Sequence, residues 1–313
     1  MTWVLILISA AYLGLIFLAA WYFERRFTVL KLQRLMPYIY SLALAVYCTA
    51  WTFYGSIGRA VESGLDYIII YLGPTLAMFI WYPLAKKLMV LKRNQGIASL
   101  ADLISARYGK SQQLGALVAI LSLVAVLPYI SLQIKAISES YILLNGSDPD
   151  RMTGFSFFDP ALYVSLAMAL FTLLFGTRYV QSTKPKPGLI GAIAAESLFK
   201  LLAFLTVAII SLLALKAEVS WVGLEYTSIS KFENLSALQE SLPILIISFF
   251  AFMLLPRQFQ MGLTENTSVR NIPKALWLFP LYLLLINLFV FPLSHLGKEL
   301  FPTANSDYFL LLA

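Results

Sequence analysis

Apolar runs long enough to cross a lipid bilayer recur along the whole 313-residue chain. The hydrocarbon core of a bilayer is about 30 Å thick, so a helix needs about 20 predominantly apolar residues to span it. Hydrophobic residues make up 60% of the sequence and charged residues only 12%, against about 45–50% and 25% in soluble domains. Because a spanning segment must satisfy its own backbone hydrogen bonds, these runs predict an all-α polytopic membrane protein. The predicted spans are Thr2–Phe23, Pro37–Gly58, Asp66–Ala85, Leu114–Leu144, Pro160–Gly176, Gly188–Leu215, Pro243–Leu255 and Ala275–Leu293, and a ninth apolar run begins at Tyr308.

The basic residues are concentrated in alternate loops. The loops at 23–36, 86–113, 177–187 and 256–274 carry 16 Lys and Arg residues, and the opposite loops carry five. By the positive-inside rule, this asymmetry predicts an external N-terminus and a cytoplasmic first loop. The net charge of +7 is therefore a topology signal, and we expect no nucleic-acid partner. The single cysteine excludes an internal disulfide and a cysteine-built metal site.

A short polar segment follows the third span. In KRNQGIASLADLISARYGK, Ser99 can cap a helix that carries Leu100, Leu103 and Ile104 on one face. This pattern indicates an amphipathic helix on the cytoplasmic surface, although a solvated connector is compatible with the same residues.

Four charged residues fall inside predicted spans, in two pairs with i, i+4 spacing: Lys135 with Glu139, and Glu196 with Lys200. This spacing puts both members of a pair on one helix face, where they can neutralise each other. The first pair lies near the end of its span and could simply reach the interface. The second pair lies deeper, where it is either a structural ion pair or a proton relay or substituted-cation site.

Prolines fall within or beside spans at Pro74, Pro128 and Pro256, and we expect each to interrupt its helix and free a backbone carbonyl. Tyr129 and Gln133 follow Pro128 one turn apart. They could line a polar cavity, or the proline could serve packing alone.

Several segments together resemble a known family. The runs YCTAWTFYGSIG, IASLADLISARYGKSQ, VLPYISLQIKAIS, AIAAESLFKLLAF and LPRQFQMGLTEN are similar to a sodium/solute symporter domain. More narrowly, they resemble the version that is fused to bacterial sensor histidine kinases of the CbrA type.

The resemblance implies a LeuT-like inverted-repeat fold with one extra N-terminal helix, incomplete at the C-terminus. The parts would be 1–36 for the extra helix and first loop, 37–215 for the first five-helix repeat, 216–242 for an outer loop, and 243–313 for the start of the second repeat. The first helix of each repeat, Pro37–Gly58 and Pro243–Met261, would be broken near the bilayer midplane. We expect the first of them to unwind around Tyr47–Ala50.

The resemblance also implies a site at these breaks. It assigns sodium-binding carbonyls to Ala45 and Cys48, and substrate-binding positions to Thr49, Ala50 and Trp51. Two departures from the family pattern bear on the ion: a bulky Tyr47 replaces a small polar residue, and the second broken helix has no glycine at its break. We therefore expect Lys200 to be able to take the place of the ion. The predicted substrate-binding residues are Tyr47, Thr49, Ala50, Trp51, Tyr54, Tyr129, Gln133, Ser248 and Phe252, and the predicted ion-binding or proton-coupling residues are Ala45, Cys48, Glu196 and Lys200.

The function implied is secondary transport of a small polar solute, such as the amino acid histidine, coupled to Na+ or H+. The fused-kinase resemblance implies a bacterial inner membrane with a periplasmic N-terminus. It also implies a cytoplasmic kinase domain in cis beyond Ala313 and a response regulator as its partner. The alternative is a membrane sensor that binds its ligand without moving it. The sequence carries no G-x-S-x-G or H-E-x-x-H motif and no paired aspartates within spans, so we expect no enzyme activity and no cofactor besides the coupling ion.

Overall fold

The computed structural model describes residues 2–26, 30–146, 159–176, 186–215, 235–300 and 305–312. Every regular element in these ranges is helical, and they contain no strand. Most of the predicted outer segment 216–242 lies outside the described residues, as does the side chain of Trp51. The helices are α1 (Thr2–Arg26), α2 (Leu30–Leu44), α3 (Ala50–Phe53), α4 (Gly55–Ser63), α5 (Ile69–Gln95), α6 (Leu100–Arg107), α7 (Gln112–Leu144), α8 (Pro160–Phe171), α9 (Pro187–Leu215), α10 (Leu235–Leu254), α11 (Pro256–Phe259), α12 (Ile272–Asn287), α13 (Val290–Leu300) and α14 (Phe309–Leu312).

Five helices are long and apolar enough to cross a membrane. A sixth candidate is the pair Ser241–Leu254 and Pro256–Thr264, which meet at a bend of 48°. The predicted span Pro160–Gly176 forms a shorter apolar helix. Pro37–Gly58 is not one helix at all, because it is divided among α2, α3 and α4. The described chain is therefore a helical membrane protein with five or six candidate spans.

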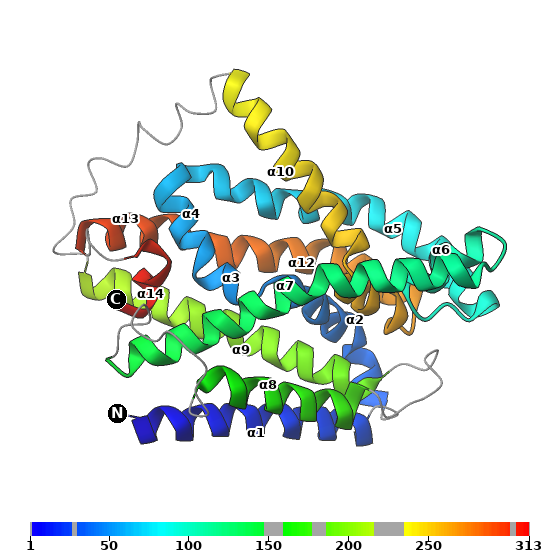
Figure 1. Ribbon diagram of the computed structural model, residues 1–313, viewed down its shortest axis with the longest axis horizontal. Coiled ribbons are helices and arrows are strands. Elements are labelled where there is room, and N and C mark those ends of the chain that lie inside the picture. Colours follow the sequence, from blue (N-terminus) through cyan, green and yellow to red (C-terminus); the bar gives the residue numbers. More distant parts are fainter. Residues whose placement is uncertain are drawn as a thin grey trace.

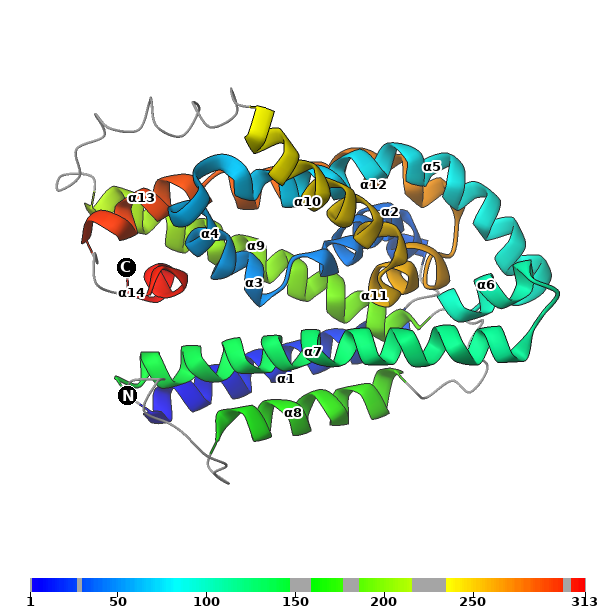
Figure 2. The same cartoon turned by 45° about the horizontal axis from the view of Figure 1, so that its top comes forward.

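The long helices run roughly along the horizontal axis of Figure 1, with α1 and α8 at the bottom and α5 and α10 at the top. In the turned view, α1, α7 and α8 lie below the other long helices (Figure 2). The connection through α6 lies at the right-hand end of Figure 1, whereas α13 and α14 lie at the opposite end.

The helices α5 and α7 continue through their prolines, contrary to our expectation of interruptions at Pro74 and Pro128. A proline removes one backbone donor, but the neighbouring hydrogen bonds of a long helix hold the helix together. Of the three prolines, only Pro256 follows a break.

Ser99 caps α6 as predicted, because its side chain accepts a hydrogen bond of 3.1 Å from the Asp102 amide. Leu100 and Leu103 of this helix pack against the main hydrophobic cluster. The segment is thus a helix docked on the bundle rather than a solvated connector.

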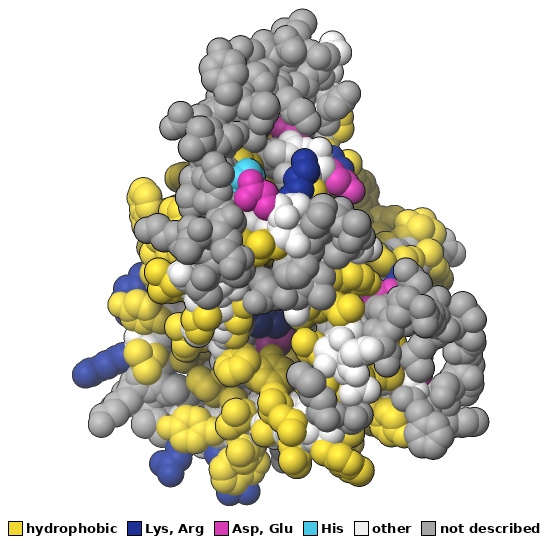
Figure 3. Space-filling view, turned by 90° about the vertical axis from the view of Figure 1, so that its left-hand side faces the viewer, with side chains coloured by type: hydrophobic (Ala, Val, Ile, Leu, Met, Phe, Trp, Pro, Cys, Tyr) yellow, Lys and Arg dark blue, Asp and Glu magenta, His cyan; other side chains and the backbone are white. Residues whose placement is uncertain are grey.

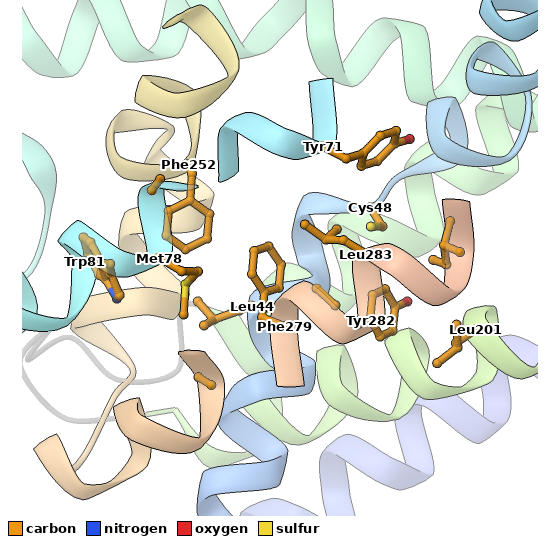
Figure 4. Close-up of a cluster of buried hydrophobic side chains, with 14 of the residues drawn as sticks. Leu44, Cys48, Tyr71, Met78, Trp81, Leu201, Phe252, Phe279, Tyr282 and Leu283 are labelled. Atoms are coloured by element: carbon orange, nitrogen blue, oxygen red, sulfur yellow. The ribbon is translucent and has the colours of Figure 1, made fainter. Parts of the chain in front are cut away.

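A cluster of buried apolar side chains fills the centre of the bundle. Figure 4 shows its members converging from five helical regions: Leu44 and Cys48 from the first broken helix, Tyr71, Met78 and Trp81 from α5, Leu201 from α9, Phe252 from α10, and Phe279, Tyr282 and Leu283 from α12. The same cluster therefore surrounds the first helix break and fixes its position.

Candidate functional site

The first broken helix loses its regular backbone hydrogen bonds between Leu44 and Ala50. Residues Ala45–Tyr47 form a 3-10 turn, Cys48 and Thr49 are extended, and α-helix resumes at Ala50. The predicted unwinding around Tyr47–Ala50 is confirmed.

Side chains replace the missing backbone partners at this break. The Ala50 amide, which would bond to the Val46 carbonyl in a continuous helix, instead donates to Gln133 Oε1 over 3.0 Å. The Thr49 amide donates to Thr52 Oγ1 over 3.2 Å. Gln133 of α7, which the sequence predicts to line a polar cavity, therefore lies at the first break. Because the Ala50 amide donates to Gln133, it does not donate to the Val46 carbonyl.

The second broken helix changes direction at Leu255. This residue has extended backbone angles (φ −61°, ψ 127°), and Pro256 begins α11. Proline suits the first position of a helix because it has no amide hydrogen to leave unpaired and its φ angle is already helical. A break therefore forms here without the glycines that the family pattern would supply.

The two breaks are joined directly. Gln258 of α11 is only 1% exposed, and its Nε2 donates to the Leu44 carbonyl over 3.2 Å. Leu44 is the last residue of α2, so Gln258 satisfies a carbonyl at the C-terminal end of that helix. Its Oε1 is buried without a hydrogen-bond partner. A buried amide with one unsatisfied oxygen is a ready acceptor for a bound polar group.

Arg257 also reaches across from the second break, although it is not among the site residues predicted from the sequence. In the sequence it is one of the basic residues of the predicted loop 256–274. It lies instead in the second half of the bent span. Its Nη1 donates to the hydroxyl of Tyr129 on α7, and its Cζ lies 4.2 Å from the centre of that ring. The proline that opens α11 was the available signal, because it puts the break immediately before Arg257.

The side chain of Tyr47 contacts two other helices of the bundle, α5 and α12. Its hydroxyl donates to the Ile70 carbonyl over 3.1 Å. Ile70 lies four residues before Pro74, so its carbonyl is the one that the proline leaves without a helical partner. The ring of Tyr47 packs edge-on against Phe279, at a centroid distance of 6.4 Å.

Other predicted residues lie in the packed core. Ala45 and Cys48 are each 1% exposed, and the Cys48 amide donates to the Ala45 carbonyl over 2.9 Å. Phe252 packs between Trp81 and Phe279, with ring centroids at 5.9 and 5.2 Å. These contacts indicate a structural part for Phe252, and its substrate role stays a prediction.

Ser248 lies where α10 crosses α5. Its hydroxyl donates to the Leu245 carbonyl over 3.0 Å, with a longer contact of 3.4 Å to the Ile69 carbonyl. Its role in substrate binding also stays a prediction.

The deep charge pair forms an ion pair, with Lys200 Nζ 2.5 Å from Glu196 Oε1. Lys200 and Tyr54 help to line a cavity of about 200 Å³ between α1, α3 and α9. Phe53 of α3 lines the same cavity, so Lys200 lies beside the helix that follows the first break.

The shallower pair also forms, with Lys135 Nζ 3.4 Å from Glu139 Oε1, and the lysine side chain is 68% exposed. Glu139 additionally accepts a hydrogen bond of 2.8 Å from the Tyr308 hydroxyl. Figure 3 shows the α13–α14 end of the molecule, where charged side chains gather in small groups and hydrophobic side chains cover the lower part of the face.

A second polar cluster closes the opposite end. Lys92, near the end of α5, donates to three backbone carbonyls: Leu263 (3.2 Å), Thr264 (2.5 Å) and Asn266 (3.1 Å). The buried Glu265 between them accepts from Gln260 Nε2 over 2.6 Å and, from the start of α9, from the Lys186 amide over 2.6 Å. These bonds tie the segment after α11 to both α5 and α9.

Helices that unwind within the membrane and expose backbone carbonyls are typical of secondary transporters. Residues 33–184, just under half of the chain, match the model of the Sodium:solute symporter family, so this part of the chain is similar to sodium:solute symporter domains. The matched region includes the whole first broken helix, α5, α6 and α7. Searches of curated proteins and of solved structures found no match. The family that this region matches is one of cation-coupled solute transporters, generally driven by Na+.

Proposed function

We propose that this chain is the membrane domain of a symporter that moves a small polar solute, such as the amino acid histidine, together with Na+ or H+. The observation that carries the proposal is the junction at which Gln258, from the second broken helix, bonds to Leu44 at the first break. Such a junction puts unpaired backbone groups of both helices at one place inside the bundle, where solute and ion can share them.

The proposal extends to the whole architecture. The two broken helices would be the first helices of two inverted repeats, with α1 as the extra N-terminal helix. The alternate distribution of basic loops supports an N-terminus on the periplasmic side of a bacterial inner membrane.

Lys200 is the proposed replacement for a bound cation. Its side chain shares a cavity with Phe53 and Tyr54, which follow the first break, and its ammonium group pairs with Glu196, so the pair can exchange a proton without leaving an isolated charge in the span. In this scheme the ion-binding and proton-coupling residues are Ala45, Cys48, Glu196 and Lys200.

The proposed partner is a cytoplasmic histidine kinase domain in the same polypeptide, acting through a response regulator. Its support is the resemblance of the sequence to symporter domains that are fused to kinases.

The test is uptake of tritiated L-histidine by the full-length protein in proteoliposomes. One set receives an inward Na+ gradient, and a second, sodium-free set receives an inward proton gradient. We expect uptake with one of these gradients and its loss after the matching ionophore. Binding of L-histidine in detergent without uptake under either gradient would instead make the chain a sensor.

The variant Lys200→Ala tests the proton-coupled form. We expect uptake in the proton gradient to fall at least about ten-fold, because Glu196 would lose the partner that neutralises it within the span. Uptake that depends on sodium and is unchanged in Lys200→Ala would refute a coupling role for this lysine. Lys87→Ala, at an exposed position of α5, is the control and should leave uptake unchanged.

A further inference from the structure

The guanidinium of Arg257 has no acidic partner among the residues that the structure describes. The four charged residues inside the predicted spans form ion pairs with one another, Glu196 with Lys200 and Glu139 with Lys135. Arg257 makes one hydrogen bond, to the neutral hydroxyl of Tyr129, and stacks on that ring. Its Nε is buried without a partner.

Placing an unpaired cation inside a membrane span is unfavourable in free energy. An arginine at the centre of a bilayer costs at least about 2.5–3.5 kcal/mol, and arginine does not lose its proton at accessible pH. A tyrosine ring and hydroxyl solvate the charge in part but do not neutralise it. The positive charge of Arg257 is therefore available to an anion that is not part of the described chain.

The surroundings of Arg257 are those of the proposed solute site. The adjacent residue Gln258 holds the first break, and its Oε1 is also without a partner. Tyr129 lies one helical turn from Gln133, which caps the restart of the first broken helix at Ala50.

The apolar groove beside this place does not offer the missing charge. This groove has a volume of about 520 Å³ and runs between α7 and α10 as far as Leu255 and Pro256. Its walls carry only apolar side chains and one serine. Among the described residues, the counter-charge of Arg257 is therefore supplied neither by this groove nor by the junction itself.

We propose that Arg257 binds the carboxylate of the transported solute, so that the substrates of this protein are small carboxylates, including amino acids recognised by their carboxyl group. The planar guanidinium presents Nε and a neighbouring Nη as a fork that matches the two oxygens of a carboxylate. The Gln258 Oε1, at the next residue, would accept a hydrogen bond from an amino group or hydroxyl of the same solute. This inference rests on the proposed function for the identity of the ligand as a transported solute.

The experiment compares acids with their amides. The full-length protein in detergent is titrated with L-histidine and L-proline, and in parallel with L-histidinamide and L-prolinamide, with thermal stabilisation as the measure of binding. We expect at least one of the two acids to bind at least about ten-fold more tightly than its amide, because a charge-assisted pair is lost. Equal binding of acid and amide, or no stabilisation by either acid, would overturn the proposal.

Variants identify the residue. In Arg257→Gln the preference for acid over amide should disappear. Arg257→Lys should retain the preference but bind the acid more weakly, because lysine keeps the charge and loses the fork. Arg270→Gln, at an exposed position beyond the second broken helix, is the matched control. If Arg257→Gln does not fold, the lysine variant decides: acid binding identical to wild type would contradict a carboxylate fork.

Two further results separate this inference from the proposed function. Stabilisation by sodium chloride that sodium gluconate does not reproduce, with no effect of the acids, would assign Arg257 to a halide and refute a carboxylate site. Acid binding that requires Arg257, without uptake in either cation gradient, would support the carboxylate site while refuting symport.

Discussion

Gln258 and Leu44 lie 214 residues apart in sequence and are joined by a hydrogen bond between the side-chain amide of the first and the carbonyl of the second. Each belongs to a different broken helix, and each lies next to its own break. The two helix breaks are therefore linked, and a displacement of the backbone at one break should strain or break the hydrogen bond to the other.

Removing this bond should destabilise the protein. In Gln258→Leu the Leu44 carbonyl loses this buried hydrogen bond, and we expect a loss of about 1 kcal/mol in the free energy of unfolding. Hydrogen exchange should also accelerate in peptides that cover residues 40–52. Gln113→Leu, at an exposed position of α7, is the control. Equal melting temperatures for both variants would contradict a structural part for the junction.

Gly73 permits the closest approach between α5 and α10. A methyl group added there would lie 2.0 Å from Ser248 Oγ and 2.6 Å from the Phe249 amide nitrogen, so Gly73→Ala would force the helices apart. We expect a loss of about 3 kcal/mol or more, at the upper end of overpacking costs. Gly14→Ala in α1 meets nothing within 4 Å and should be neutral or stabilising. Thermal unfolding in detergent tests the pair, and similar stabilities would refute the close crossing.

Lys92 should stabilise the packing of the segment after α11 against α5. Lys92→Met keeps much of the length of the side chain but removes three hydrogen bonds to the carbonyls that follow α11. We expect a loss of about 2–3 kcal/mol and faster proteolysis or exchange around residues 263–271. The control Lys87→Met changes an exposed lysine of the same helix. Unchanged exchange in this segment would show that the lysine does not hold it.

Asp307 should make stability depend on pH. It lies in the 3-10 helix Ser306–Tyr308, outside the candidate spans, and burial raises its pKa, with further contributions from the negative charges of Glu62 and Glu139. A raised folded-state pKa favours the protonated form. The stabilisation is present below the ordinary value of about 3.9 and is lost as pH rises through the folded value.

Asp307→Asn should therefore melt at a higher temperature than wild type at pH 7, and the difference should shrink as the pH is lowered toward 4. Asp102→Asn is the contrasting variant, because that carboxylate accepts a hydrogen bond from the Ala98 amide and its loss should not stabilise. A wild-type advantage at pH 7 over Asp307→Asn would contradict the raised pKa.

Much of the helical organisation could be predicted from local sequence. Long apolar runs identify most of the candidate spans, and the break around Tyr47–Ala50 was predicted from the resemblance to the symporter family. The cap at Ser99 and both i, i+4 ion pairs follow from spacing alone. Such features depend on residues that are near each other in the chain.

The partners of the break could not be predicted in this way. Nothing near Gln258 in the sequence reveals that it faces Leu44, since the contact depends on how α11 leaves α10. The sequence predicts a loop position for Arg257, because the apolar run that precedes it ends at Pro256. The continuity of α5 and α7 also exceeded expectation, because a long helix tolerates one missing bond when its remaining bonds and its packing are intact.

The hydrogen bond from Tyr47 to the Ile70 carbonyl links Pro74 in α5 to the first broken helix. The proline deprives this carbonyl of its helical partner, and the tyrosine that restores the partner belongs to the unwound segment. Any displacement of that segment that moves Tyr47 away strips α5 of a hydrogen bond in its first turns. Near the other end of the same helix, Lys92 bonds to the carbonyls that follow α11. The helix α5 is therefore attached near one end to the first broken helix and near the other end to the second.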